Sequence, residues 1–398
     1  MKVSPKLSAV ILFLLASISG CSQSPTSVGR KIIPGSDKYT VHDTSIASIS
    51  DTTFKFSSPN GSGGNLLVGS YASVNAKSLL LFLVTMPDSM TTVQIDTAEL
   101  ILTASYGWNV ALPPTPVQFE IKEVLTPWSA STATADSFSS LNLLPTNSSL
   151  VTITNQDTLS IGREVVTQFD TSLVRRWINI YADTVLPRFF SIALVTKPAL
   201  SNVGIWGFYQ FGSQYPPALQ IIYEKNGVKD SISLSVGEGT FLATNNALQP
   251  SASIETQAGI SFYGRIKFNL SPVSDSVNKV IVNNAVLQLT LNNSQSKLGF
   301  GSSDSVIAYV AGSASTQADS IAPSYFGYGY RKDTTQTTNS VYIFTLTSMV
   351  QQWINTPSNN FGLELRPGND ASYLDTHIFY SSKDPAKGPK LFITYTKK

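Results

Sequence analysis

The stretch Thr97-Ala98-Glu99-Leu100-Ile101-Leu102-Thr103 decides the fold class of this chain of 398 residues. Its even-numbered residues are apolar, and alternate side chains of a β-strand point to the same face of a sheet. That face is therefore predicted to pack against a second sheet. A matching stretch, Ala285-Val286-Leu287-Gln288-Leu289-Thr290, follows 187 positions later.

The match extends along the body of the chain and indicates an internal duplication. At the same offset of 187, Asp43 and Phe54 match Asp230 and Phe241. The offset shortens to 176 where Trp177 matches Trp353, and to 172 where segment 217–223 matches segment 389–395. Two copies of one domain, with loops of different length, explain all three offsets.

The duplication and the N-terminal sequence together predict four regions. These are a signal peptide at residues 1–20, a lipidated N-terminus and tether at 21–42, and two domains at 43–224 and 230–398. The boundary is a polar, Gly-containing connection at residues 224–229. A connection of this length is too short to let the two copies move far apart.

Within each copy, short runs of alternating hydrophobicity are bounded by Gly, Pro, Asn, Asp and Ser. This pattern is typical of antiparallel strands joined by turns. The predicted class is all-β, with two tandem antiparallel β-sandwiches of jelly-roll-like form, each with one short helix. The clearest predicted strands are 78–84, 97–103, 117–124, 189–195 and 219–223, then 265–270, 285–291, 305–310, 361–365 and 391–395.

The short helix is predicted at residues 171–178 and again at 347–354, with Thr or Ser as the N-cap. Trp177 and Trp353 fall on its apolar face. Exposed tryptophans serve as platforms that stack on sugars, but a tryptophan on the apolar face of a short helix usually belongs to the core. Both rings are therefore interpreted as core.

Cys21 is the only cysteine, and it ends the segment Leu15-Ala16-Ser17-Ile18-Ser19-Gly20-Cys21. Lys2 and Lys6 precede an apolar run at residues 9–18, which is too short to span a bilayer. This arrangement resembles bacterial lipoprotein precursors and implies diacylation of Cys21. The alternative is a buried structural cysteine. The lipoprotein interpretation predicts export and a membrane partner, with the anchor in the outer membrane or at the cell surface.

The composition limits the classes of partner. Loss of Lys2 and Lys6 with the signal leaves as many basic as acidic residues, so there is no electrostatic case for nucleic acid. Charged residues make up 13% of the chain, and hydroxyl and amide side chains take their place. Acidic polymers usually recruit Arg and Lys, so this surface favours neutral glycans over uronates.

Several motifs resemble the DNRLRE domain, which is also classed as carbohydrate-binding module family 96. They are Arg265-Ile266-Lys267-Phe268, the Pro-Asp-Ser at 87–89 with the strand that follows it, the segment 165–177, and the closing Pro-x-Leu-x-Ile-x-Tyr of each copy. The resemblance implies β-sandwiches of secreted or surface proteins that bind carbohydrate. The chain departs from the family after the third long strand, where two tryptophans are common: copy one keeps only Trp128, and copy two has Ala314 to Ala318. Segments 28–35 and 67–71 also resemble an uncharacterised family of Bacteroidetes-type lipoproteins, and that kinship would weaken a sugar-binding role.

No catalytic motif stands out. His42 and His377 are the only histidines, and neither has a partner at metal-ligand spacing, so no metal and no cofactor are predicted. Asp375-Thr376-His377 is interpreted as polar surface rather than as an acid–base pair, because no nucleophile motif accompanies it. The chain is predicted not to be an enzyme. A hydrolase or lyase would need clustered carboxylates or a Tyr/His/Arg group in one cleft.

Aromatic residues near Gly-rich loops are the candidate ligand-stacking residues, because an exposed ring offers a flat apolar face with a polar tip. They are Tyr106, Trp108, Trp128, Tyr325, Tyr328 and Tyr330. For Trp108 and the tyrosines at 325–330 the alternative is a ring that packs its own loop, whereas Trp206 and Tyr209 are assigned to the core. The predicted function is binding of polysaccharide at the cell surface. The alternative is a structural or adhesive surface protein that binds protein partners.

Overall fold

The computed structural model describes residues 40–55, 59–61, 64–108, 117–153, 162–197, 204–210, 212–246, 253–274, 279–302, 304–312, 326–331 and 339–397. Strands dominate this part of the chain, which confirms the predicted all-β class. Two α-helices interrupt the strands, α4 (Thr171–Ala182) and α5 (Thr347–Asn355), close to their predicted positions. No helix among the described residues is both long enough and apolar enough to cross a membrane.

The first sheet has the spatial order β12-β11-β4-β10-β2-β3-β9-β5-β6, with β7 on β5 and β8 on β4. Its strands are β2 (Leu66–Tyr71), β3 (Val74–Leu83), β4 (Gln94–Trp108), β5 (Val117–Val124), β6 (Leu143–Pro145), β7 (Val151–Ile153), β8 (Glu164–Gln168), β9 (Ser191–Thr196), β10 (Gly204–Phe208), β11 (Ala218–Lys225) and β12 (Val228–Asn245).

The second sheet has the spatial order β1-β21-β15-β18-β17-β16-β19-β14-β13-β20. Its strands are β1 (Thr40–Lys55), β13 (Ser253–Gln257), β14 (Phe262–Phe268), β15 (Val280–Asn292), β16 (Val306–Val310), β17 (Phe326–Arg331), β18 (Asn339–Thr345), β19 (Leu363–Pro367), β20 (Thr376–Tyr380) and β21 (Lys390–Lys397). We call the first sheet with α4 the first half, and the second sheet with α5 the second half.

The strand pairing of the first half recurs in the second. β4 pairs with β8, β10 and β11, as β15 pairs with β18, β20 and β21. β3 pairs with β2 and β9, as β14 pairs with β13 and β19. Every predicted strand lies within or overlaps one of these strands.

Each half closes on itself through one long strand that turns a corner. β12 pairs with β11 along its first part and with β3 along its second, and its register shifts between Val236 and Glu238. β1 does the same with β21 and β14, with a shift between Ser48 and Ser50. The result is a sandwich-like fold, because a strand that changes partners at a bulge connects two facing layers.

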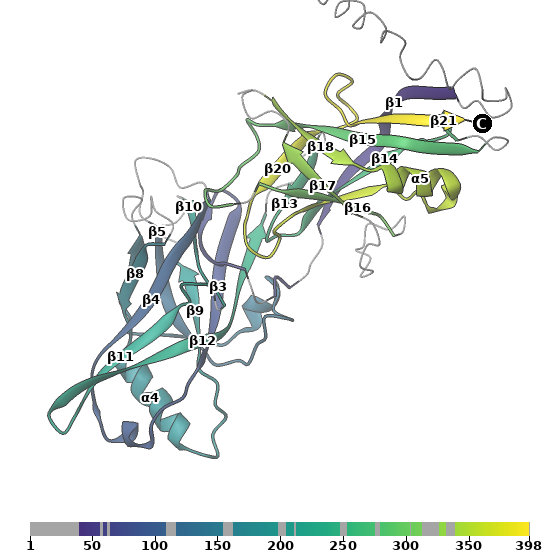
Figure 1. The fold of residues 1–398 in the computed structure, drawn as a ribbon. Coiled ribbons are helices and arrows are strands. Elements are labelled where there is room, and N and C mark those ends of the chain that lie inside the picture. Colours follow the sequence, from purple (N-terminus) through teal and green to yellow (C-terminus); the bar gives the residue numbers. More distant parts are fainter. Residues whose placement is uncertain are drawn as a thin grey trace, which may run out of the picture.

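The two long strands that turn a corner, β1 and β12, do not follow the predicted domain boundaries. β1 begins within the predicted tether and belongs to the predicted first domain, yet it lies in the second half; Figure 1 shows it in purple beside the yellow β21. β12 was assigned to the second domain, yet it lies in the first half. The predicted linker at 224–229 is instead a tight hairpin, where Asn226 and Gly227 have φ of +53° and +75°. An Asn-Gly loop suits this turn and holds β12 against β11.

Each half has its own apolar core. Ala98, Leu100 and Leu102 point into the core of the first half, as the alternation predicted. Trp177, Trp206 and Trp353 are at most 2% exposed, which confirms their assignment to the core.

The predicted Thr or Ser N-caps are wrong. Asp170 caps α4 by accepting from the backbone N–H groups of Ser172 and Leu173, and Leu346 precedes α5 with no side-chain cap bond. The hydroxyl of Thr347 accepts instead from the backbone N–H of Ala285, so tertiary contact takes it away from its own helix.

Candidate functional site at the junction of the two halves

Tyr106 lies where the two halves meet, which we call the junction. It is fully buried, and its hydroxyl donates to Asp375 Oδ1 at 3.0 Å and accepts from the backbone N–H of Leu374 at 3.1 Å. Burial, with the nearby Asp375 carboxylate as the second cause, raises the pKa of the Tyr106 phenol well above its ordinary value. This ring therefore joins β4 to the second half as a neutral hydrogen-bonded group.

Trp108 is also buried at the junction, at 3% exposure. Its Nε1 donates to the backbone carbonyl of Lys297 at 3.3 Å, and its ring meets the ring of Tyr71 edge-on. Between the two aromatics, Gly107 exchanges backbone hydrogen bonds with Phe300. A Cβ at Gly107 would stand 2.0 Å from the Phe300 ring, so only glycine permits this approach.

The prediction that Tyr106 and Trp108 stack on a ligand is therefore wrong. β4 continues through both residues to Trp108, where the sequence suggested an exposed loop. Their rings are covered by the second half, because burying aromatic surface between the halves stabilises the junction.

The other predicted stacking residues lie in three settings. Trp128 is half-buried, packs on Val124, Leu79 and their neighbours, and donates from Nε1 to the hydroxyl of Ser191 at 2.8 Å. Tyr328 and Tyr330 belong to β17, for which only the backbone is described. Tyr325 and Cys21 lie outside the described residues.

Asp375 and His377 are buried, so their interpretation as polar surface residues is also wrong. Asp375 is 4% exposed and accepts from the backbone N–H of Gly299 at 2.8 Å as well as from Tyr106. Burial raises the pKa of the Asp375 carboxyl. His377 is 1% exposed, and its Nε2 lies 2.9 Å from Asp304 Oδ1. The bond from Tyr106 to Asp375 connects the two halves, whereas the contact between His377 and Asp304 lies within the second half.

A cleft opens at the junction, lined by residues of both halves. We call it the junction cleft, and its volume is about 240 Å³. Its lining residues are Gly64, Asn65, Tyr209, Gln210, Gly212, Ser213, Ser372 and Tyr373.

Aromatic rings and uncharged polar groups make up this lining. The Tyr209 ring lies 5.7 Å from the ring of Tyr215, which is 41% exposed, and the Tyr373 ring lies 5.0 Å from Tyr106. Burial, then the neighbouring Asp375, raises the pKa of Tyr373, so its phenol stays neutral at physiological pH. Among the described residues of the lining there is no Asp, Glu, Lys, Arg or His.

Gln210 lines the junction cleft and is largely buried. It is 4% exposed, and its Nε2 donates to the backbone carbonyl of Gly239. Its Oε1 is buried and has no hydrogen-bond partner among the described residues. A buried carbonyl oxygen without a partner is costly, so a ligand hydroxyl or a water at this position is favoured.

Asn65, in contrast, already has partners for both ends of its amide. Its Nδ2 donates to the Ser372 carbonyl at 2.9 Å, and its Oδ1 accepts from the Ser105 hydroxyl at 2.8 Å. The Asn65 side chain therefore connects the two halves and needs no further partner. In the cleft lining, the buried acceptor without a partner among the described residues is Gln210 Oε1.

Sequence reasoning missed this cleft. It assigned Tyr209 to the core because Tyr209 continues the alternation of Trp206, but β10 ends at Phe208 and leaves Tyr209 half-buried beyond the strand. Tyr209 and Gln210, which stand just before the segment Phe211-Gly212-Ser213, were a usable signal, because binding residues concentrate in loops on a rigid scaffold.

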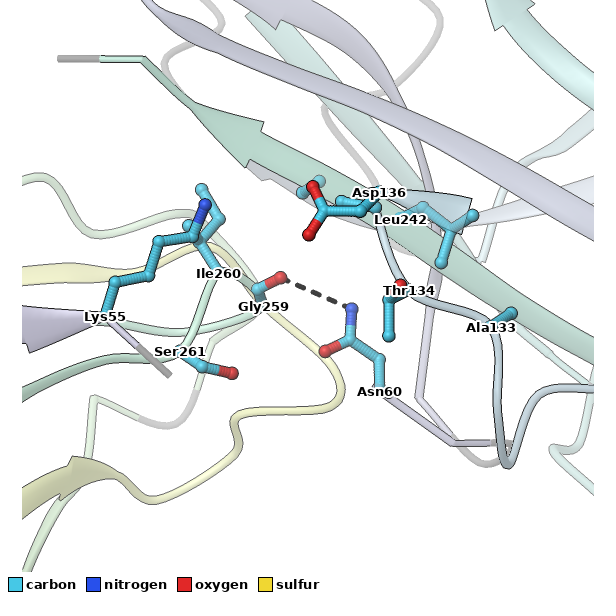
Figure 2. A pocket seen from close by; sticks show the side chains of 11 residues that line it. Lys55, Asn60, Ala133, Thr134, Asp136, Leu242, Gly259, Ile260 and Ser261 are labelled. Atoms are coloured by element: carbon cyan, nitrogen blue, oxygen red, sulfur yellow. Dashed lines mark hydrogen bonds between the residues drawn. The ribbon is translucent and has the colours of Figure 1, made fainter. Parts of the chain in front are cut away.

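A second pocket at the junction is too small for an organic ligand. It is lined by Lys55, Asn60, Asp136 and their neighbours, and its interior volume of about 30 Å³ holds one water. Figure 2 shows Asn60 reaching the carbonyl of Gly259, at 3.3 Å, and the same Nδ2 lies 2.9 Å from the Phe241 carbonyl. Asn60 lies between β1 and β2, so its two hydrogen bonds attach this connection to both halves.

Comparisons with known proteins identify no relative. No protein-family model matches the chain, and no curated protein is significantly similar to it. The resemblance to the DNRLRE domain therefore stays a prediction. No group of three or more His, Cys, Asp or Glu side chains suited to a metal lies in the described part of the chain.

Proposed function

We propose that this protein is a non-catalytic surface lipoprotein, anchored through Cys21, that binds neutral polysaccharide in the junction cleft. The observation that carries the proposal is the cleft lining, which combines Tyr209 and Tyr373 with Gln210, whose buried Oε1 has no hydrogen-bond partner among the described residues. A sugar ring presents apolar C–H faces to aromatic rings and hydroxyl groups to amides, so its chemistry suits this lining.

The charge and the size of the cleft support the choice of a neutral polymer. The described lining residues carry no carboxylate or ammonium group that could pair with an amino sugar or a uronate. Clefts that enclose a whole drug-sized molecule begin at about 300 Å³. The smaller junction cleft, at about 240 Å³, suits a short stretch of a chain that continues outside it.

The test is a glycan array and a polysaccharide pull-down with residues 22–398, which include every described residue. Two variants alter the cleft: Tyr209→Ala removes a ring, and Gln210→Met removes the amide while keeping the length of the side chain. Tyr181→Ala is the matched control, because Tyr181 is a half-buried tyrosine on α4, outside the junction cleft.

We expect selective binding of a neutral glycan, weakened at least tenfold in both cleft variants and unchanged in Tyr181→Ala. Circular dichroism spectra of the variants check that each remains folded. Binding that survives both cleft substitutions would move the site elsewhere. No binding to any glycan would favour the structural or adhesive role.

A further inference from the structure

The first strand of each repeat completes the sheet of the other half. β12 follows β11 through the Asn226-Gly227 hairpin and fills the place between β11 and β3. β1 fills the equivalent place between β21 and β14, which are the last and third strands of the second repeat. Strand donation from one repeat to its neighbour is thus already part of the fold.

The core-facing positions of the two donated strands can be compared through their partners. Leu234 of β12 faces Leu219, and Ile46 of β1 faces the matching Leu391. Counting by twos from these residues, β12 has Ile232 and Val236 where β1 has Thr44 and Ser48.

β1 fits its place less well than β12. Leu234 and Val236 are at most 1% exposed, whereas the hydroxyl of Ser48 is buried with no hydrogen-bond partner in the described part of the chain. Val41 and Ile49 of β1 are 59% exposed, and Phe54 is the one residue of the strand that is buried.

This difference decides how each strand is held. Burial of an aliphatic side chain contributes about 1.5–3 kcal/mol, so β12 is held by its side chains as well as by backbone hydrogen bonds. β1 buries fewer aliphatic side chains, and besides the backbone ladder it is held by contacts such as the His42 ring stacked on Tyr395 and the Ile46 side chain against the core. A second copy of the same strand offers the same ladder and the same side chains, so exchange between copies replaces every contact except those of the connecting segment.

We propose that β1 is exchanged between copies of this protein, so that the β1 of one copy completes the second half of the next. The contact is head-to-tail and repeats the way in which β12 completes the first half. Reciprocal exchange of β1 between two copies closes a dimer, and donation in one direction builds a ring or an open chain. This inference is independent of polysaccharide binding.

Cysteine cross-linking tests the proposal, because residues 22–398 contain no native cysteine. One preparation carries Asp43→Cys on β1, and another, with a size tag, carries Thr394→Cys on β21. These residues are direct cross-strand partners, and the Thr394 hydroxyl donates to Asp43 Oδ1 at 2.6 Å. Opposed residues in antiparallel strands have Cα atoms about 4.5–5.5 Å apart, which permits a disulfide.

The matched control is the equivalent pair of the first half. Ser231→Cys on β12 and Ile222→Cys on β11 are also direct partners, but the hairpin keeps this pair within one molecule. The two single variants of each pair are mixed at high concentration, incubated and oxidised. A double variant, Asp43→Cys with Thr394→Cys, reports the contact within one molecule.

We expect at least tenfold more cross-linked heterodimer from the β1 and β21 pair than from the control pair. Equal yields from the two pairs, together with an internal cross-link in the double variant, would overturn the proposal. A double variant that forms no internal cross-link while the single variants form no heterodimer would also overturn it, because β1 would then not lie beside β21.

Discussion

The two halves share most of their strand pairings, yet they stabilise their helices differently. In the first half, Trp177 Nε1 donates to Glu123 Oε1 at 3.1 Å, and the same carboxylate forms an ion pair with Arg176. The Glu123 side chain is 4% exposed, so the indole and the guanidinium satisfy a buried charge.

In the second half this network is absent from the described residues. In the second half, Val310 pairs with Leu363 in the way that Glu123 pairs with Ile192 in the first half. Val310 therefore takes the place of the Glu123 carboxylate. Likewise, Gln352 takes the place of Arg176. Trp353 Nε1 and Gln352 Oε1 are buried with no hydrogen-bond partner in the described part of the chain. The difference teaches that this fold requires the packed indole and tolerates the loss of its polar partner.

The largest expected effect comes from making the first half resemble the second. Glu123→Val leaves Trp177 Nε1 without its acceptor, and we expect the free energy of unfolding to fall by about 2 kcal/mol. Urea titration measures the change. Glu120→Val, at a partly exposed position on the same strand, is the control and should change stability much less. Equal effects of the two substitutions would show that the carboxylate of Glu123 contributes nothing specific.

A paired substitution isolates the indole N–H. Trp177→Phe removes a donor that has a partner, whereas Trp353→Phe removes a donor that has none. Both lose similar volume, so we expect Trp177→Phe to be the more destabilising by about 1.5 kcal/mol. The difference between the two urea midpoints is the measurement, and a larger effect at Trp353 would contradict our account of the two sites.

The helix caps also differ, and the stronger one is in the first half. Its loss is expected to lower the stability by a smaller amount than the substitutions above. Asp170→Ala removes the bonds to Ser172 and Leu173 and should cost about 1 kcal/mol. Thr347→Val removes only the bond from Ala285 N and should cost less. If thermal unfolding shows equal losses, the cap of α4 is no stronger than the single contact at α5.

The smallest expected effect is a pH dependence of the free energy of unfolding that comes from the N-cap of α4. Burial alone would raise the pKa of Asp170, but hydrogen bonds from Ser172, Asn147 and Leu173 outweigh it and lower the pKa. A lowered carboxyl pKa adds stability above the unfolded pKa of about 4, and this stability is lost as the pH falls through the folded pKa.

Asp170→Asn keeps a capping acceptor without a charge. Between pH 5 and pH 3 the wild type should therefore lose more stability than this variant, as measured by urea titration at each pH. Parallel losses in the two proteins would assign the acid sensitivity to other groups.

The strands and the cores were open to prediction from the sequence, because alternation such as Ala98, Leu100 and Leu102 follows directly from burial of one face. The helices at residues 171–178 and 347–354 were predicted for a similar reason. The Asp170 cap was missed, although it lies directly before Thr171, because two hydroxyl residues also stood near the start of the helix.

The candidate site was largely beyond the sequence. Tyr106, Trp108 and Tyr209 are all aromatic residues near glycines, and no local signal separates a ring buried between the halves from one that lines a cleft. Asp375 and His377 were misread for the same reason, since their burial depends on residues far away in the chain, such as Tyr106 and Asp304.

The sequence by itself determined that this protein is built from β-strands in two matching sets, because period-two hydrophobicity and an internal repeat are local properties of the chain. Only the tertiary structure decided which set each strand completes, since β1 and β12 each begin one repeat and cross to the other half. It also decided which aromatics remain accessible. Pairing and burial depend on contacts between segments far apart in sequence, and the junction and its cleft consist of such contacts.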